Sequence, residues 1–242
     1  MAEWLDLTKS LVRCGYLILA SADMSGEQRV KLVCASLLAR SLSNIRGAIV
    51  LVEAGRLVEA RTLVRCCFEN EFWLAALAAK GRAFVEEMMH DEIRARQSSG
   101  QFMFEDAQTR ESLAPEVEEK VRKWLGQSKK EWPQAATLNP QEVAKRTEVG
   151  GAYNFYRQLS GDAAHPSLTS LNRYVEEERG EVVGINADPL ASGAELADTL
   201  SLGCVALLGA CVGASQIFDP EHQIKELGDV WKRHQHLTGL TE

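Results

Sequence analysis

Residues 199–218 read TLSLGCVALLGACVGASQIF, a run of twenty residues without a charged side chain. Such a run is long enough to cross a lipid bilayer, and its Gly209-x-x-x-Gly213 spacing is found where membrane helices pack closely. However, the run is rich in Gly, Ala and Cys, and it is flanked by Asp198 and Asp219 instead of basic or aromatic residues. We therefore expect a helix buried in the middle of a helical bundle, and no membrane span.

The residues on either side of this run have helical periodicity almost throughout. The helix expected over 57–79 is apolar nearly all round in its second half and belongs in the middle of the bundle. Ser25 and Gln28 have the spacing of a capping box and predict the start of another long helix. The expected helices cover residues 3–21, 25–54, 57–79, 83–97, 115–130, 140–148, 153–164, 168–172, 190–218 and 220–237.

Arg179-Gly180, between β-forming residues, is the one hairpin signal and predicts a small hairpin near 173–185. The sequence thus predicts an all-α, multi-helix up-and-down bundle with one small β-hairpin insertion. We expect a single helical domain over residues 1–242, since a chain of this length can bury one core. Residues 100–150 mix charges with tryptophan and proline and predict a lid-like or side-layer insertion.

Composition limits the partners. The net charge is −7, so the surface as a whole repels nucleic acid and anionic membranes. The six cysteines form no C-x-x-C pair, and no stretch has the pattern of a secretory signal peptide. These features predict reduced, mostly buried thiols in a cytoplasmic protein.

Polar side chains gather between residues 153 and 167, which read YNFYRQLSGDAAHPS. Arg157 offers a planar fork for phosphate oxygens, and His165 can carry the proton transfers of phosphodiester cleavage. Tyr153 lies one turn before Arg157 on the same helix face, and Asp162 lies three residues before His165, where it could orient the ring. The alternative is structural: Ser160, Asp162 and His165 satisfy backbone groups at a helix end.

A second polar group lies on the expected central helix. Arg61, Arg65 and Glu69 follow each other at intervals of four residues and form one stripe beside apolar residues. Charges that enter a bundle core must be paired, so we expect them to pair with each other and with the 153–165 segment. The stripe is either a structural ion pair that sets helix register or part of a site.

Together these residues resemble a known family. Arg65-x-x-x-Glu69, Tyr156-Arg157-x-x-Ser160 and His165-Pro166-Ser167 are similar to a bacterial all-helical domain family of unknown function, over roughly residues 40–175. That family is distantly similar to the HEPN superfamily of toxin–antitoxin and phage-defence systems. Active HEPN proteins are metal-independent ribonucleases that use an Arg, a polar residue and a His, usually at a dimer interface.

The resemblance implies a site of Arg157, Gln158 and His165, although seven residues separate Arg157 from His165, where the motif usually has fewer. It implies a ribonuclease or phosphate-processing protein of a defence or toxin type, with RNA or a phosphorylated small molecule as ligand. It further implies a homodimer, an antitoxin partner and no cofactor. Arg61, Arg65, Glu69, Tyr156 and Ser160 are then binding residues, and Arg157, His165, Tyr153 and Asp162 are catalytic ones.

Two other functions remain open. The first is a non-catalytic helical bundle that binds a ligand or a protein. The second is a carboxylate/His dinuclear metal site, because Glu87-x-x-His90 and Asp162-x-x-His165 place a carboxylate three residues before a His. The remaining metal ligands would be Glu69 together with Glu53 or Glu71. We expect the histidines of the last helix to face solvent: His222, His234 and His236.

Overall fold

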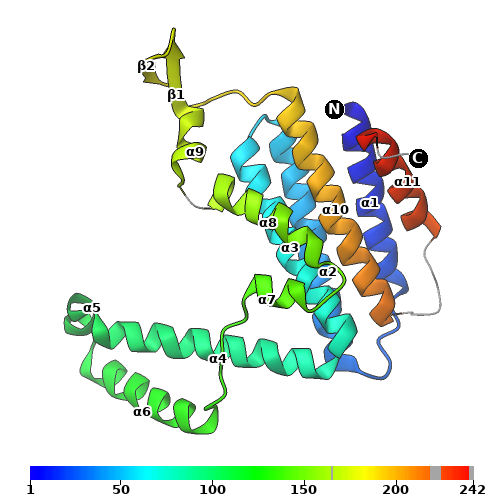
Figure 1. The fold of residues 1–242 in the computed structure, drawn as a ribbon. Coiled ribbons are helices and arrows are strands. Elements are labelled where there is room, and N and C mark those ends of the chain that lie inside the picture. The colour runs from blue at the N-terminus through cyan, green and yellow to red at the C-terminus, as the bar shows by residue number, and fades with distance from the viewer. Residues whose placement is uncertain (165, 219–224, 240–242) are drawn as a thin grey trace.

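The computed structural model describes residues 1–164, 166–218 and 225–239, and in this part of the chain the fold is all-α with one two-stranded hairpin. Four long helices lie side by side in a bundle, and a fifth covers its edge (Figure 1). They are α1 (Ala2–Ser21), α2 (Gln28–Glu53), α3 (Leu57–Lys80), α10 (Gly193–Phe218) and α11 (Lys225–Thr238). The predicted fold class is confirmed.

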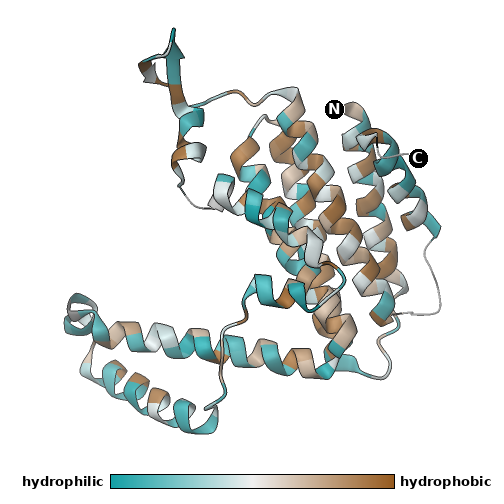
Figure 2. Ribbon diagram, in the orientation of Figure 1, coloured by the Kyte–Doolittle hydropathy of each residue, from teal (hydrophilic) through white to brown (hydrophobic). Residues whose placement is uncertain are grey.

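Helix α10, which contains the uncharged run, lies in the middle of the bundle and packs against α1, α2 and α3. Small residues let it approach closely: a side chain at Gly213 would place its Cβ 3.3 Å from the backbone of Leu74 on α3. Hydrophobic residues run along α10 and its neighbours, whereas α6 is mostly hydrophilic (Figure 2). The close approach explains why this helix is rich in Gly and Ala.

Two of the described helices, α2 and α10, are long and apolar enough to cross a membrane. This is weak evidence for a span, because the core helix of a bundle meets the same criteria. In α10, 56% of the most apolar window is buried inside the protein. The length and composition of α10 are thus explained by its central position.

The ends of the bundle helices are set by single residues. Gly55 and Gly81, with φ of 74° and 55°, stand where α2 and α3 end. The predicted capping box at the start of α2 is wrong, because its N-cap residue is Glu27 and makes no side-chain cap. Ser25 instead hydrogen-bonds Asp23 through both its backbone N–H and its hydroxyl, and this local turn competes with capping.

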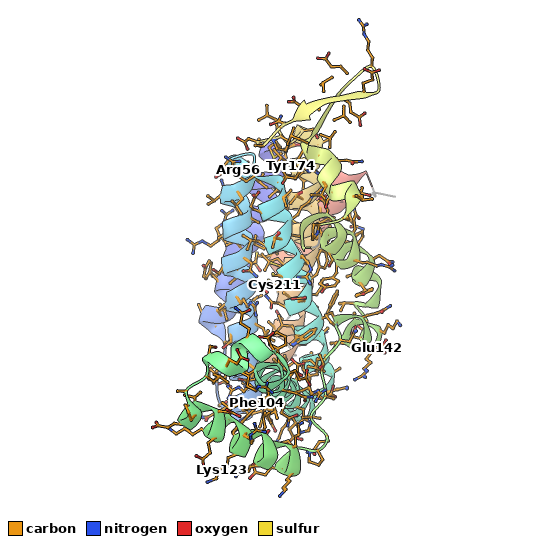
Figure 3. The ribbon with its side chains drawn as sticks, turned by 90° about the vertical axis from the view of Figure 1, so that its left-hand side faces the viewer. Arg56, Phe104, Lys123, Glu142, Tyr174 and Cys211 are labelled. Atoms are coloured by element: carbon orange, nitrogen blue, oxygen red, sulfur yellow. The ribbon has the colours of Figure 1, made fainter. Side chains whose placement is uncertain are left out.

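Beyond the bundle, a helical arm projects from its lower end (Figures 1 and 3). It consists of the second half of α4 (Arg82–Glu105), then α5 (Ala107–Ser112) and α6 (Pro115–Glu131), which folds back along α4. The prediction that α4 ends at residue 97 is wrong. Leu125 of α6 packs on Gly100, and buried Gln97 donates a hydrogen bond to Ser128 at 3.0 Å. This packing stabilises the helix through its weak Ser98-Ser99-Gly100 segment.

After the arm the chain returns to the bundle. Helix α7 (Pro140–Lys145) lies on α3, and the 3₁₀ turn η1 (Gly150–Ala152) leads into α8 (Tyr153–Leu159) and the π-helical turn η2 (Ser160–Ala164). Next come α9 (Leu168–Leu171) and η3 (Asn172–Tyr174).

The hairpin follows η3 and extends away from the bundle at the end opposite the arm (Figure 1). Strands β1 (Val175–Glu178) and β2 (Glu181–Ile185) pair antiparallel. Arg179 and Gly180 between them both have positive φ, at 56° and 84°, as a tight two-residue turn of the primed kind requires. The position of the predicted hairpin is confirmed.

Candidate functional site

The polar site is built where α8 and η2 lie along the middle of α3. Tyr156 and Leu159 are the buried residues of α8, and they anchor it to the core. The ring of Tyr156 meets that of Phe72 on α3 edge to face, with centroids 5.8 Å apart. Aromatic packing therefore holds α8 in place, and the polar side chains follow at its end.

Arg65 lies at the centre of the first group of contacts. Its Nε donates to the hydroxyl of Ser160 at 2.8 Å, and its Nη2 donates to the hydroxyl of Tyr156 at 2.6 Å. The same nitrogen lies 3.1 Å from Glu69, which also accepts a hydrogen bond from Tyr156 at 2.8 Å. The predicted pairing of Arg65 with Glu69 and with the 153–165 segment is confirmed.

The Tyr156 hydroxyl is neutral in this setting. Burial, and then its hydrogen bond to the Glu69 carboxylate, raise the pKa of Tyr156 to about 12. The guanidinium of Arg65 also lies over its ring, 4.7 Å from the centroid. Tyr156 therefore works as a hydrogen-bond bridge between a cation and an anion.

Asp162 lies at the centre of the second group. Arg61 on α3 forms an ion pair with its carboxylate and also donates to Thr199 on α10 at 3.2 Å. Arg173 of η3 approaches the other carboxylate oxygen at 3.8 Å and binds Glu195 on α10 at 2.9 Å. Asp162 thus connects η2 directly to α3 and η3, and the two arginines extend this connection to α10.

Glu195 is held ionised within this second group. The backbone N–H of Ser192, and then the Arg173 guanidinium, lower its pKa to about 2. Ser192 and Glu195 also cap the start of α10 reciprocally, with hydrogen bonds of 2.9 and 3.2 Å. The cap therefore fixes one end of the chain of ion pairs.

We refer to these side chains as the clamp, because they fasten η2 to α3 and α10: Arg61, Arg65, Glu69, Tyr156, Ser160, Asp162, Arg173 and Glu195. The side chains of its three arginines are only 13–19% exposed. Each arginine faces at least one carboxylate, so the clamp is close to electrically balanced. A one-turn π-helix at a site held this firmly is an arrangement often seen at functional sites.

The remaining predicted site residues are placed differently. The side chain of Arg157 is exposed and makes no hydrogen bond or ion pair within residues 1–164, 166–218 and 225–239. Successive residues of a helix point about 100° apart, so Arg157 faces outward when Tyr156 faces α3. Tyr153 is half-buried and stacks on Tyr156 at 5.6 Å. The structure does not bring either side chain into the clamp.

His165 lies outside the described residues, so its predicted approach to Arg157 stays a prediction. Asp162 was expected to orient His165. In the described residues, the carboxylate of Asp162 is bound by Arg61 and Arg173. Sequence reasoning missed Arg173, Glu195 and Thr199, which lie far along the chain from α8. The Ser192-x-x-Glu195 capping box was a readable signal for one of them.

The proposed ligands of a dinuclear metal site are separated. Glu87 forms ion pairs with Lys80 and Arg146, at 2.6 and 3.4 Å, and Glu53 pairs with Lys9 at 2.8 Å. Within the described part of the chain no three His, Cys, Asp or Glu side chains come together as a metal-binding group. The described ligands therefore do not support this hypothesis.

The prediction that His234 faces solvent is wrong. It is 5% exposed, stacks on Trp231 at 5.4 Å and meets the ring of Trp4 edge to face. Burial lowers its pKa. His236 is exposed as expected, and His222 lies outside the described residues. All six cysteines are free thiols, and all but Cys66 are buried, which confirms their expected core role.

Comparison with known proteins shows that most of the chain matches one protein family. Residues 31–182 match a family of unknown function (DUF5677), and this range includes the arm, α8, η2 and most of the clamp. No curated protein and no solved structure matches the chain.

Proposed function

The chain belongs to a family of unknown function (DUF5677), and we propose that it acts on phosphate esters, RNA first among them, through a metal-independent site at the end of α8. The observation that carries this proposal is the clamp. Three arginines from α3 and η3 hold the turn Ser160–Ala164, which directly precedes His165 in the chain. A firmly held turn of this kind is what a precisely placed proton-transfer group needs.

Arg157 supplies the second element of the proposal. Its guanidinium is exposed and lacks a carboxylate partner in the described regions, in contrast to the three arginines of the clamp. An unpaired guanidinium can bind two phosphate oxygens at once. His165, by its place in the sequence, would then transfer the proton of the attacking or leaving hydroxyl. In this arrangement Arg65 and Asp162 are positioning residues.

The wider setting follows from the resemblance to the HEPN superfamily. We propose that the protein works in the bacterial cytoplasm as a homodimer, as a toxin or defence protein with an antitoxin partner. Arg157 offers an exposed cation for a phosphate group on a chain with a net charge of −7.

The deciding experiment compares RNA cleavage and growth inhibition for wild type, His165→Ala and Arg157→Ala, with EDTA present throughout. Loss of the proton-transfer group should slow cleavage by about a hundredfold or more. Arg179→Ala, at an exposed hairpin position, is the matched control and should cleave like wild type. Thermal unfolding of each variant shows whether the fold is retained.

Two results would contradict the proposal. The first is wild-type protein that neither cleaves RNA nor inhibits growth. The second is cleavage that continues unchanged in both His165→Ala and Arg157→Ala. A destabilised His165→Ala variant of an inactive wild type would identify the polar segment as scaffold.

A second candidate function, a protein-binding bundle without catalysis, is favoured by the arm. Its buried residues are few, and four large apolar side chains on it are between 36% and 62% exposed: Phe102, Met103, Val117 and Trp124. Exposed apolar residues that gather on a projecting element are typical of binding surfaces. Phe102→Ser with Trp124→Ser should then abolish the biological effect and leave any RNA cleavage unchanged.

A further inference from the structure

A groove lies between α3 and the second half of α10, with the chain after α7 along one side. Its volume is about 720 Å³, within the range of about 300–1,000 Å³ that is usual for small-ligand pockets. Trp231 of α11 stands at the rim of the groove. The walls are mostly aliphatic and include Ala75, Ala79, Val205, Leu208 and Val212. None of these residues belongs to the clamp, so the groove is a separate feature from the proposed phosphate site.

Glu71 lies one helical turn before Ala75 on α3, and its side chain lies against Gly209 in the wall of this groove. Its side chain fills the space above Gly209, which lines the groove, and its Cδ is 2.6 Å from where a Cβ at that position would stand. Only glycine leaves room for the carboxyl there. Glu71 is 3% exposed, and its Oε2 is buried with no hydrogen-bond partner in the described residues.

An unpaired carboxyl in this position is costly. Burial raises the pKa of Glu71 well above its usual value, and no cation among the described residues offsets that effect. A buried polar group without a partner lowers the stability of the folded state, because it has lost its hydrogen bonds to water. The clamp does not use Glu71, and packing does not require a carboxyl, because an aliphatic side chain would fill the same space. A ligand that donates hydrogen bonds would provide the partner that the protein lacks.

The charges at the rim indicate which ligand fits. Lys145 pairs with Glu142 at 3.3 Å, and Arg146 pairs with Glu87 at 3.4 Å, so these two cations already have anionic partners. Glu148, exposed at the rim, adds a further carboxylate. Glu148 is thus the one charged side chain of the groove lining that lacks an ionic partner in the described residues, and a cation complements it.

We propose that this groove binds a small hydrophobic ammonium compound. Its apolar body lies against the alanines of α3 and the aliphatic side chains of α10. Its ammonium group points past Gly209 and donates hydrogen bonds to the carboxyl of Glu71. Charge-assisted hydrogen bonds of this kind are among the strongest that a protein offers.

Calorimetric titration with n-hexylammonium tests the proposal, with n-hexanol and hexanoate as probes of equal chain length and different charge. We expect n-hexylammonium to bind most tightly. Glu71→Gln should weaken its binding by about tenfold and leave n-hexanol binding unchanged. The full-length protein is used throughout, and thermal unfolding confirms that each variant is folded.

Two further variants separate the groove from the rest of the surface. Ala79→Trp, at an exposed position of the wall, should block binding of n-hexylammonium without disturbing the core. Val50→Trp, on the exposed face of α2 and outside the groove, is the control and should bind like wild type. Equal binding by Glu71→Gln and wild type, preference for hexanoate, or no binding of n-hexylammonium at millimolar concentration would each overturn the proposal.

Discussion

At the scale of single residues, the hydroxyl of Tyr156 lies between Arg65 and Glu69 and hydrogen-bonds both of them. Tyr156→Phe keeps the ring and its contact with Phe72 and removes only these two bonds. Hydrogen bonds to charged groups contribute about 1.5–3 kcal/mol each, and relaxation of the partners reduces the net loss. We expect the free energy of unfolding to fall by about 1–3 kcal/mol in urea denaturation.

Tyr153→Phe is the matched control for this prediction. Tyr153 stacks on the neighbouring ring of Tyr156, and its hydroxyl makes no hydrogen bond in the described part of the protein. Its loss should change stability by less than about 0.5 kcal/mol. Equal effects of the two substitutions would show that the bridge through Tyr156 contributes nothing.

Glu71 predicts a pH dependence with a definite sign. Its pKa is raised in the folded protein above the usual 4.5, so the folded state holds a proton that the unfolded state has lost. The stabilisation that the bound proton provides is complete below pH 4.5, and it is lost as pH rises to the pKa of Glu71 in the folded protein. Glu71→Gln removes this dependence. We expect the melting temperature of the variant, minus that of wild type, to increase by a few degrees from pH 5 to pH 8.

That gain is measured as the difference between the two melting temperatures at each pH, which cancels the titration of all other groups. A difference that stays constant from pH 5 to pH 8 would contradict the raised pKa. A difference that falls as pH rises would mean that the pKa of Glu71 is lowered on folding.

At the scale of elements, the contact of α3 with α10 depends on small residues. A Cβ at Gly213 would lie 3.3 Å from the backbone of Leu74, which cannot move without shifting α3. Gly213→Leu should therefore destabilise the bundle by about 3 kcal/mol, the upper part of the usual range for overpacking. Urea denaturation followed by circular dichroism measures the loss.

Gly228→Leu is the control for the contact between α3 and α10. Gly228 lies on the exposed face of α11, and a Cβ there meets no atom within 4 Å. Because leucine favours the helix over glycine by up to about 1 kcal/mol, this variant should be as stable as wild type or more stable. Destabilisation of both variants alike would mean that the close approach of Gly213 to α3 does not explain the effect.

At the scale of the whole molecule, the arm and the bundle differ in the size of their cores. The bundle core contains buried side chains of α1, α2, α3, α10 and α11, together with residues of α4, α7 and α8. Between α4 and α6, by contrast, the buried residues are Gln97, Gly100, Leu125 and Ser128. Amide hydrogens of α6 should therefore exchange through local opening, at least about tenfold faster than those of α3 and α10. Hydrogen–deuterium exchange with mass spectrometry measures this, and equal protection of α6 and α10 would contradict it.

Local patterns in the sequence predicted most of the elements. Periodicity located the bundle helices to within a few residues, and Gly55 and Gly81 marked two of their ends because positive φ favours glycine. Arg179-Gly180 located the hairpin turn for the same reason. The ion pair of Arg65 with Glu69 was also predictable, because residues four apart share a helix face. Each of these features depends on residues close together in the chain.

Contacts between distant residues had to come from the tertiary structure. The length of α4 depends on Leu125 packing against Gly100, and the partners of Asp162 come from α3 and η3. Likewise His234 is buried because Trp4, at the other end of the chain, lies beside it. The sequence by itself determined which segments are helical and which faces are apolar, since both follow from local geometry. Which polar side chains meet was decided by the packing of helices, because only the folded chain brings residues far apart in sequence within hydrogen-bonding distance.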